Sequence, residues 1–164
     1  MSRKQCARKP RPVYANPLIV ARNQATRLTA AERATIMTPL RAAFDRLRQG
    51  AASDTDWCVL AGCVHLAQNI ERQGVVRGLD AHLKEADQAL CEVEARASAS
   101  GRWRSPTLHF YELDALRLFV DDLFDFQLRQ LSYAEYRRVY TTTEGQARSR
   151  GAVVVKMGEV SHEE

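Results

Sequence analysis

The sequence predicts an all-α protein, a bundle of about five helices with an extended basic N-terminal arm and a short C-terminal tail. Apolar residues recur every three or four positions through most of residues 29–150, which is the period of an amphipathic helix. Capping motifs stand immediately before two of these apolar runs. The 164 residues, 45% apolar and 27% charged, fit one globular domain that needs no disulfide or metal to hold its core.

The first helix is predicted to begin after Thr29, because Thr29 and Glu32 form a capping box that satisfies backbone N–H groups of the first turn. Gly50 can adopt the left-handed conformation that ends a helix. Pro39 has no N–H to donate to the preceding turn, so we expect a kink there or a new start with Thr38 as the cap. The apolar positions of this segment are Leu40, Phe44 and Leu47.

Two further helices follow. Ser53, Asp54 and Thr55 offer N-caps to a helix that Gly74 closes. Its predicted buried stripe consists of Trp57, Leu60, Ala61, Val64, Ala67 and Ile70. Gly78 leads into the next helix, which fades into the small-residue run 97–101. Its predicted buried positions are Leu79, Leu83, Ala86, Leu90 and Val93.

The longest helix is predicted over residues 105–131. Ser105 followed by Pro106 is the favoured pairing of a capping residue with a proline at the first helical position. On a helical wheel its apolar residues cover about half of the circumference, which indicates several neighbours and a central place in the core. These residues are Leu108, Leu113, Leu116, Phe119, Val120, Leu123, Phe124, Phe126 and Leu131. A second capping box, Ser132 with Glu135, starts a fifth helix.

The chain is therefore expected to divide into an extended arm (residues 1–28), the helical bundle (29–150) and a tail (151–164). In the tail, Val153, Val154 and Val155 have the β-branched composition of a short strand. One pairing partner for it would be the arm residues Leu18, Ile19 and Val20. No stretch approaches the roughly 20 apolar residues that cross a bilayer. We therefore expect a cytoplasmic protein with no membrane contact and with reduced cysteines.

A metal site is not expected. Cys58, Cys63 and His65 have the side chains that bind zinc. On one helix, however, Cys58 and His65 lie about 10 Å apart along the axis. Cys63 points about 140° away from Cys58. These positions favour buried thiols and a histidine at the edge of a packed face, with no cofactor.

Catalysis is not expected either. Asp114, Asp121, Asp122 and Asp125 are candidates for a carboxylate cluster, but Arg117 and Arg129 lie three or four residues away and favour a solvated ladder of ion pairs. His109 and Glu112 lie one turn apart beside the apolar face and could transfer a proton if a cleft reached them. A buried hydrogen-bonded pair is the commoner arrangement. We therefore predict no enzymatic activity and no small-molecule substrate.

The charge distribution is uneven, because the first thirty residues carry seven basic side chains and no Asp or Glu. Such a cluster attracts phosphate or an acidic protein surface. A tryptophan between two arginines in the loop after the third helix could stack on an unpaired base, or plug the edge of the bundle. The candidate contact residues are Arg3, Lys4, Arg8, Lys9, Arg11, Arg22, Arg27, Arg102, Trp103 and Arg104.

Three segments carry a resemblance: the opening Arg8-Lys9-Pro10-Arg11-Pro12-Val13 with Asn16-Pro17, the segment 52–69, and the segment 125–132 with Glu135. In layout they resemble small uncharacterised helical accessory proteins of proteobacterial phages, prophages and plasmids. The resemblance implies a bacterial or phage cytoplasmic origin and an accessory role. Such an origin would favour binding to a host macromolecule as the mode of action.

We therefore predict a non-catalytic binding module that acts through protein–protein interaction. Self-association is one form of it, because the apolar face of the long helix is wider than a small bundle requires. The alternative is a nucleic-acid-binding accessory protein that uses the basic arm and the Arg102-Trp103-Arg104 loop.

Overall fold

The computed structural model describes residues 16–151, and it confirms the all-α bundle. Its elements are α1 Pro17–Ala25, α2 Ala30–Arg48, α3 Asp54–Arg72, α4 Asp80–Ser98, α5 Phe110–Leu118, the π-helical η1 Phe119–Leu123, α6 Phe124–Gln130 and α7 Tyr133–Ser149. Since α5, η1 and α6 follow one another without a break, they form one long helix. Within residues 16–151 the β-type pairing is a single isolated bridge between Arg27 and Ser132.

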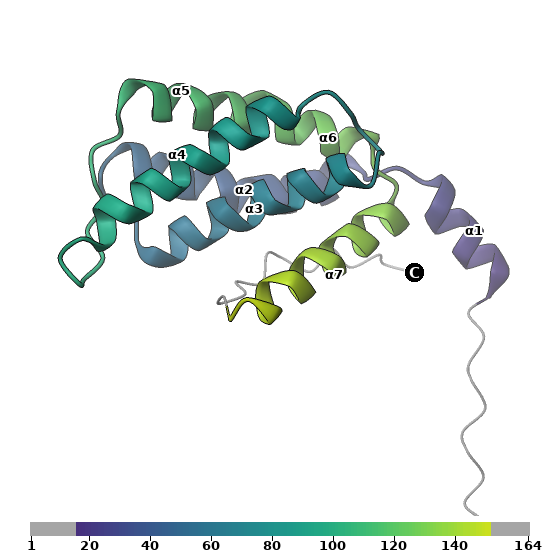
Figure 1. Ribbon diagram of the computed structural model, residues 1–164. Coiled ribbons are helices and arrows are strands. Elements are labelled where there is room, and N and C mark those ends of the chain that lie inside the picture. Colours follow the sequence, from purple (N-terminus) through teal and green to yellow (C-terminus); the bar gives the residue numbers. More distant parts are fainter. Residues whose placement is uncertain (1–15, 152–164) are drawn as a thin grey trace, which may run out of the picture.

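The bundle is layered around α3 (Figure 1). α3 packs against α2, α4, α6 and α7, so it, and not the long helix, occupies the centre. α4 packs on one side of α3 and α7 on another, while α5 lies along α4 (Figure 1). The fully buried side chains of α3 include Leu60, Val64 and Ile70, as its predicted stripe requires. No helix of the described chain is long and apolar enough to cross a membrane.

The predicted capping boxes are confirmed. Thr29 Oγ1 accepts the N–H of Glu32 at 3.2 Å, and the Glu32 carboxylate accepts the N–H of Thr29 at 2.6 Å. Ser132 and Glu135 repeat this exchange at the start of α7. α2 runs through Pro39 without a new start, and the Thr38 hydroxyl donates to the Ala34 carbonyl inside the helix. Side chains that satisfy backbone donors locally were thus reliable markers of where helices begin.

The predicted start of the long helix at Ser105 and Pro106 is wrong. The helix begins at Phe110, and the Glu112 carboxylate accepts the N–H of His109 in its first turn. The chain between α4 and α5 is held by tertiary contacts: the indole N–H of Trp103 donates to the Ala52 carbonyl at 2.8 Å. The N–H of Arg104 also donates to the Ala97 carbonyl at 3.0 Å, so the chain just before Ser105 is fixed by contacts with α4 and Ala52, and the local preference of Ser105 and Pro106 for a helix start is overridden.

The π-helical turn changes which face of the long helix is buried. The N–H of Phe124 bonds to the carbonyl of Phe119, five residues earlier, so one extra residue is accommodated. The side chains of α6 are therefore rotated about the helix axis by about 100° relative to their positions in a continuous α-helix. This rotation turns Phe124 and Leu128 fully into the core and brings Phe126, which the wheel placed on the core face, to the surface at 48% exposure.

The N-terminal prediction is corrected in part. Pro17–Ala25 forms α1, with Asn16 as its cap, so the second half of the expected arm is helical and α1 packs against α7. This helix includes Leu18 and Ile19, which excludes them from the strand pairing considered for them above. The proposed partner strand, with Val153, Val154 and Val155, lies outside the described residues, as do residues 1–15.

Candidate functional site

An apolar groove with binding potential lies between α4 and α5. The side chain of Phe110 is 79% exposed, that of Tyr111 55% and that of Leu118 37%, although all three are large and apolar. They surround a groove of about 740 Å³. Its lining residues are His82, Lys84, Glu85, Gln88, Ala89, Phe110, Tyr111, Asp114, Ala115 and Leu118. Exposed apolar side chains gathered around a hollow are typical of binding surfaces.

A buried ion pair fixes the start of α5 on α4 and so fixes the groove. Arg96 of α4 donates to both carboxylate oxygens of Glu112, at 2.6 Å each. Burial by itself would raise the pKa of Glu112, but the Arg96 guanidinium and the His109 N–H more than offset it and lower that pKa. Glu112 is therefore buried and hydrogen-bonded, but the side chain that pairs with it is Arg96, and the predicted partner His109 contributes its backbone N–H. The His109 ring itself is exposed.

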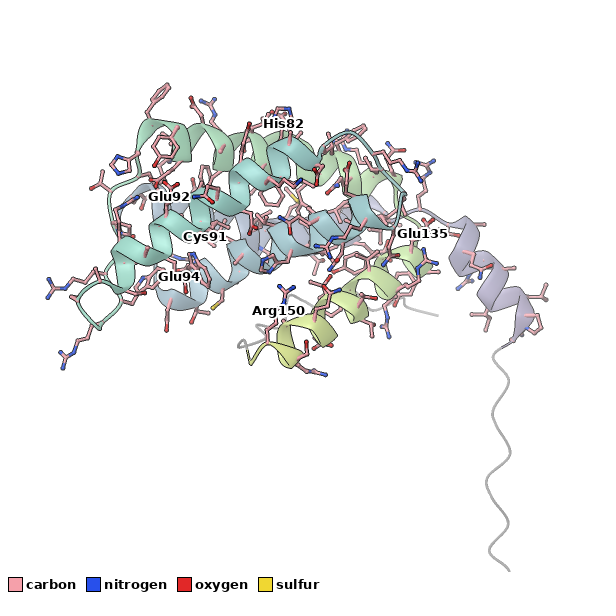
Figure 2. The ribbon with its side chains drawn as sticks, in the orientation of Figure 1. His82, Cys91, Glu92, Glu94, Glu135 and Arg150 are labelled. Atoms are coloured by element: carbon pink, nitrogen blue, oxygen red, sulfur yellow. The ribbon has the colours of Figure 1, made fainter. Side chains whose placement is uncertain are left out.

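Tyr111 is held in place at the edge of the groove. Its hydroxyl donates to the carboxylate of Glu92, which Figure 2 labels on α4. This hydrogen bond lowers the pKa of Glu92 and raises that of Tyr111. The rings of His109 and Tyr111 stack in parallel at 5.7 Å. The aromatic rim is thus oriented in advance, which reduces the entropy lost on binding.

The helices that form the groove are acidic. α4 carries five acidic and two basic residues, and the long helix from Phe110 to Gln130 has the same balance. Figure 2 shows Glu92 and Glu94 along α4, and His82 near its start. Asp114 lies one turn from both Phe110 and Leu118 and forms no hydrogen bond or ion pair with another of the described residues. The groove therefore offers an apolar stripe with an uncompensated carboxylate at its middle.

The helical wheel of the long helix did not identify these groove residues. Phe110, Tyr111 and Leu118 lie away from the core face of the long helix, so they were left out of its apolar set. The available signal was that three large apolar residues, at positions i, i+1 and i+8, lie outside the core face. Large apolar side chains that gather on one surface indicate a binding site.

Among the described residues, those predicted to contact nucleic acid are not brought together. Arg102 and Arg104 are exposed in the loop at the end of α4, but Trp103 lies between them with its ring 6.3 Å from that of Trp57. Its indole N–H donates a hydrogen bond to the Ala52 carbonyl. Trp103 thus plugs the edge of the bundle, one of the two roles considered for it. A ring packed in this way has less surface on which a base could stack.

The remaining arginines lie elsewhere. Arg22 and Arg27 are at the α1 end of the bundle, opposite the loop with Arg102 (Figure 1). Arg27 donates to the side chain of Gln130 at 2.7 Å and to the backbone carbonyl of Arg129. The other candidate residues, Arg3, Lys4, Arg8, Lys9 and Arg11, lie outside the described residues.

The three residues considered for zinc do not converge. Cys63 is fully buried, which raises the pKa of its thiol, while Cys58 is half-buried. His65 faces Asp87 of α4, with 3.5 Å between Nε2 and Oδ1. Residues 16–151 contain no group of three or more His, Cys, Asp or Glu side chains placed to hold a metal ion.

Two of the four aspartates of the long helix form ion pairs with arginines of the described chain. Asp121 lies 3.6 Å from Arg117, and Asp125 accepts from Arg129 at 2.8 Å. Asp125 also faces Arg33 of α2 at 3.5 Å. Two of the ion pairs predicted along this helix are therefore present, Arg117 with Asp121 and Arg129 with Asp125. The aspartates that form them are spread along the helix and do not gather into a catalytic cluster.

Comparison of the chain with protein-family models, with curated protein sequences and with solved structures gave no match. The resemblance to accessory proteins of phages and plasmids stays a prediction. The groove is therefore the feature from which a function is inferred.

Proposed function

We propose that this protein is a non-catalytic binding module that acts through protein–protein interaction, and that the α4–α5 groove is its binding site. The observation that carries the proposal is the exposure of Phe110, Tyr111 and Leu118 around one groove. Complete burial of a side chain of this size contributes about 1.5 to 3 kcal/mol. Three such side chains can therefore support specific binding after the entropy of association is offset.

The shape and charge of the groove favour a helical partner segment with basic residues. Phe110, Asp114 and Leu118 follow at intervals of four and span about 12 Å along α5, which is the length of two helical turns. A helix-in-groove interaction uses anchors at this spacing. The acidic surroundings attract Lys or Arg and repel acidic segments. If the chain is a phage or mobile-element accessory protein, a cytoplasmic host factor would supply this segment.

Selection from a random peptide library tests the proposal without knowledge of the partner. Peptides are selected for binding to the wild-type protein, and the affinity of the selected peptides for the variant Phe110→Ser is then measured. We expect enriched sequences that place two or three large apolar residues on one helical face and carry a net positive charge. Their affinity should fall at least tenfold with Phe110→Ser. Enrichment of acidic sequences, or equal binding to both proteins, would contradict the proposal.

Phe126→Ser is the matched control for that experiment. Phe126 is also an exposed phenylalanine of the long helix, but it does not line the groove. The selected peptides should bind Phe126→Ser as tightly as the wild type. An equal loss of affinity with both variants would indicate nonspecific apolar adhesion.

Nucleic-acid binding is the second candidate function. Arg22, Arg102 and Arg104 are exposed, and their side chains form no ion pair or hydrogen bond within residues 16–151. Together with the basic N-terminal residues they could neutralise phosphates. Binding to a short DNA or RNA should then fall steeply between two salt concentrations and collapse when residues 1–12 are removed. Affinity that is independent of this truncation would exclude the arm.

A further inference from the structure

We propose that the occupant of the α4–α5 groove is a second copy of this chain, which inserts its α1 with the basic sequence around it. This inference rests on the proposed function, because it names the partner of the same groove. The contact is head-to-tail: the groove of one copy receives α1 of the next copy.

α1 has the surface that such an occupant needs. Leu18 is 78% exposed and Ile19 is 48% exposed, so α1 presents adjacent large apolar side chains that its own bundle does not cover. Arg22 lies one turn further along and is also exposed. The nine residues of α1 extend about 13 Å, which matches the distance of about 12 Å along α5 between Phe110 and Leu118.

The charges of the two surfaces are complementary. Residues 1–28 carry seven basic side chains and no acidic one, whereas α4 carries five acidic and two basic residues, and so does the long helix from Phe110 to Gln130 that begins with α5. Asp114 lies in the apolar stripe and has no partner among the described residues. Leu18 and Arg22 are one turn apart, as are Phe110 and Asp114, so Arg22 of the incoming α1 can pair with Asp114 while Leu18 and Ile19 contact Phe110.

The position of α1 favours a second copy over the chain's own groove. α1 packs against α7, and α7 and α4 both pack against α3 from different sides (Figure 1). The two complementary surfaces of one chain are therefore on different sides of the bundle. Two surfaces that cannot meet within a chain can meet between copies, and the product is a chain of subunits or a closed ring.

Two full-length variants that each lose one half of the contact provide the test. The groove variant carries Phe110→Ser with Asp114→Lys, and the α1 variant carries Leu18→Ser with Ile19→Ser. All four positions are exposed, so both variants should fold. Circular dichroism spectra and melting temperatures check that they do. Because the interface is small, we expect dissociation constants of the wild type of order 10 to 100 μM.

In sedimentation velocity at about 100 μM, the wild type should form dimers and longer oligomers, and each variant alone should remain monomeric. An equimolar mixture of the two variants should form a dimer and stop there, because only one intact groove and one intact α1 remain. Raising the salt from 50 to 500 mM should weaken the wild-type association roughly tenfold, since the charges are then screened. Phe126→Ser should associate like the wild type.

Other outcomes overturn the proposal. A monomeric wild type at this concentration, or a mixture that stays monomeric, excludes the head-to-tail contact. Loss of association in the groove variant but not in the α1 variant would indicate a symmetric groove-to-groove dimer. If the peptide library yields basic helical ligands that need Phe110 while the wild type stays monomeric, the proposed function survives and only the self-association is wrong.

Discussion

The inner and outer faces of the long helix carry the same kind of side chain with different consequences. On the inner face Leu116, Phe119 and Phe124 are fully buried against neighbouring helices. On the outer face Phe110, Leu118 and Phe126 are exposed, and two of them line the groove. The difference teaches that apolar content alone does not separate side chains that stabilise the fold from those available for recognition. Position relative to the core, set partly by the π-helical turn, separates them.

The difference between the inner and outer faces is tested most strongly by the matched substitutions Phe119→Ala and Phe110→Ala. Phe119 is fully buried and its ring lies 5.4 Å from that of Phe124, so its truncation leaves a cavity. We expect Phe119→Ala to lower the free energy of unfolding by about 3 to 5 kcal/mol. Urea denaturation followed by circular dichroism measures the change. A loss below 1 kcal/mol would show that this face is not tightly packed.

The ion pair that joins α4 to α5 should have the next largest effect. Arg96→Met leaves the Glu112 carboxylate buried without its cation, and we expect a loss of about 2 to 3 kcal/mol, moderated by the partial exposure of Arg96. The double variant Arg96→Met with Glu112→Gln should recover part of this loss, since the buried charge is gone. Urea unfolding of the wild type, Arg96→Met, Glu112→Gln and the double variant gives the coupling free energy. A coupling near zero would mean that the pair does not fix α5 on α4.

A pH dependence is expected from α3, outside the groove. Asp56 caps α3 through Ser53 and accepts from Arg46 at 3.0 Å, and this hydrogen bond lowers the pKa of Asp56 to about 2. Because the folded pKa is lower than the unfolded value of 3.8, the stabilisation is complete above that value and is lost as the pH falls towards 2. The contribution is about 2 kcal/mol.

Acid unfolding of Asp56→Asn measures this contribution. The variant should be less stable at pH 7 by about that amount, and the gap should close as the pH approaches 2. The lowered pKa of Glu112 has the same sign, so its stabilisation is also lost in acid. A constant difference between wild type and Asp56→Asn from pH 7 to pH 2 would contradict this assignment.

The smallest effect on stability should come from the outer face. Phe110→Ala should change the free energy of unfolding by no more than about 0.5 kcal/mol, since its side chain loses little contact with the bundle. The same substitution should remove most binding in the peptide and sedimentation experiments. A destabilisation comparable to that of Phe119→Ala would show that Phe110 belongs to the core, and the distinction between the faces would fail.

Much of the fold was predictable from residues that act on their immediate neighbours. Thr29 with Glu32 and Ser132 with Glu135 mark two helix starts because each pair satisfies N–H groups three residues away. Within α3 the helical period identified Leu60, Val64 and Ile70 correctly as buried. The groove was not predictable in this way, since it depends on which helix lies beside α5.

The sequence by itself determined the all-α class, most helix limits and the charge difference between the N-terminal region and the two acidic helices. These properties depend on composition and on contacts a few residues long. Only the tertiary structure decided that the long helix begins at Phe110, that a π turn exposes Phe126 and that Arg96 joins Glu112. Each of these outcomes depends on contacts between elements distant in the chain, and their energies exceed the local preferences that a sequence pattern records.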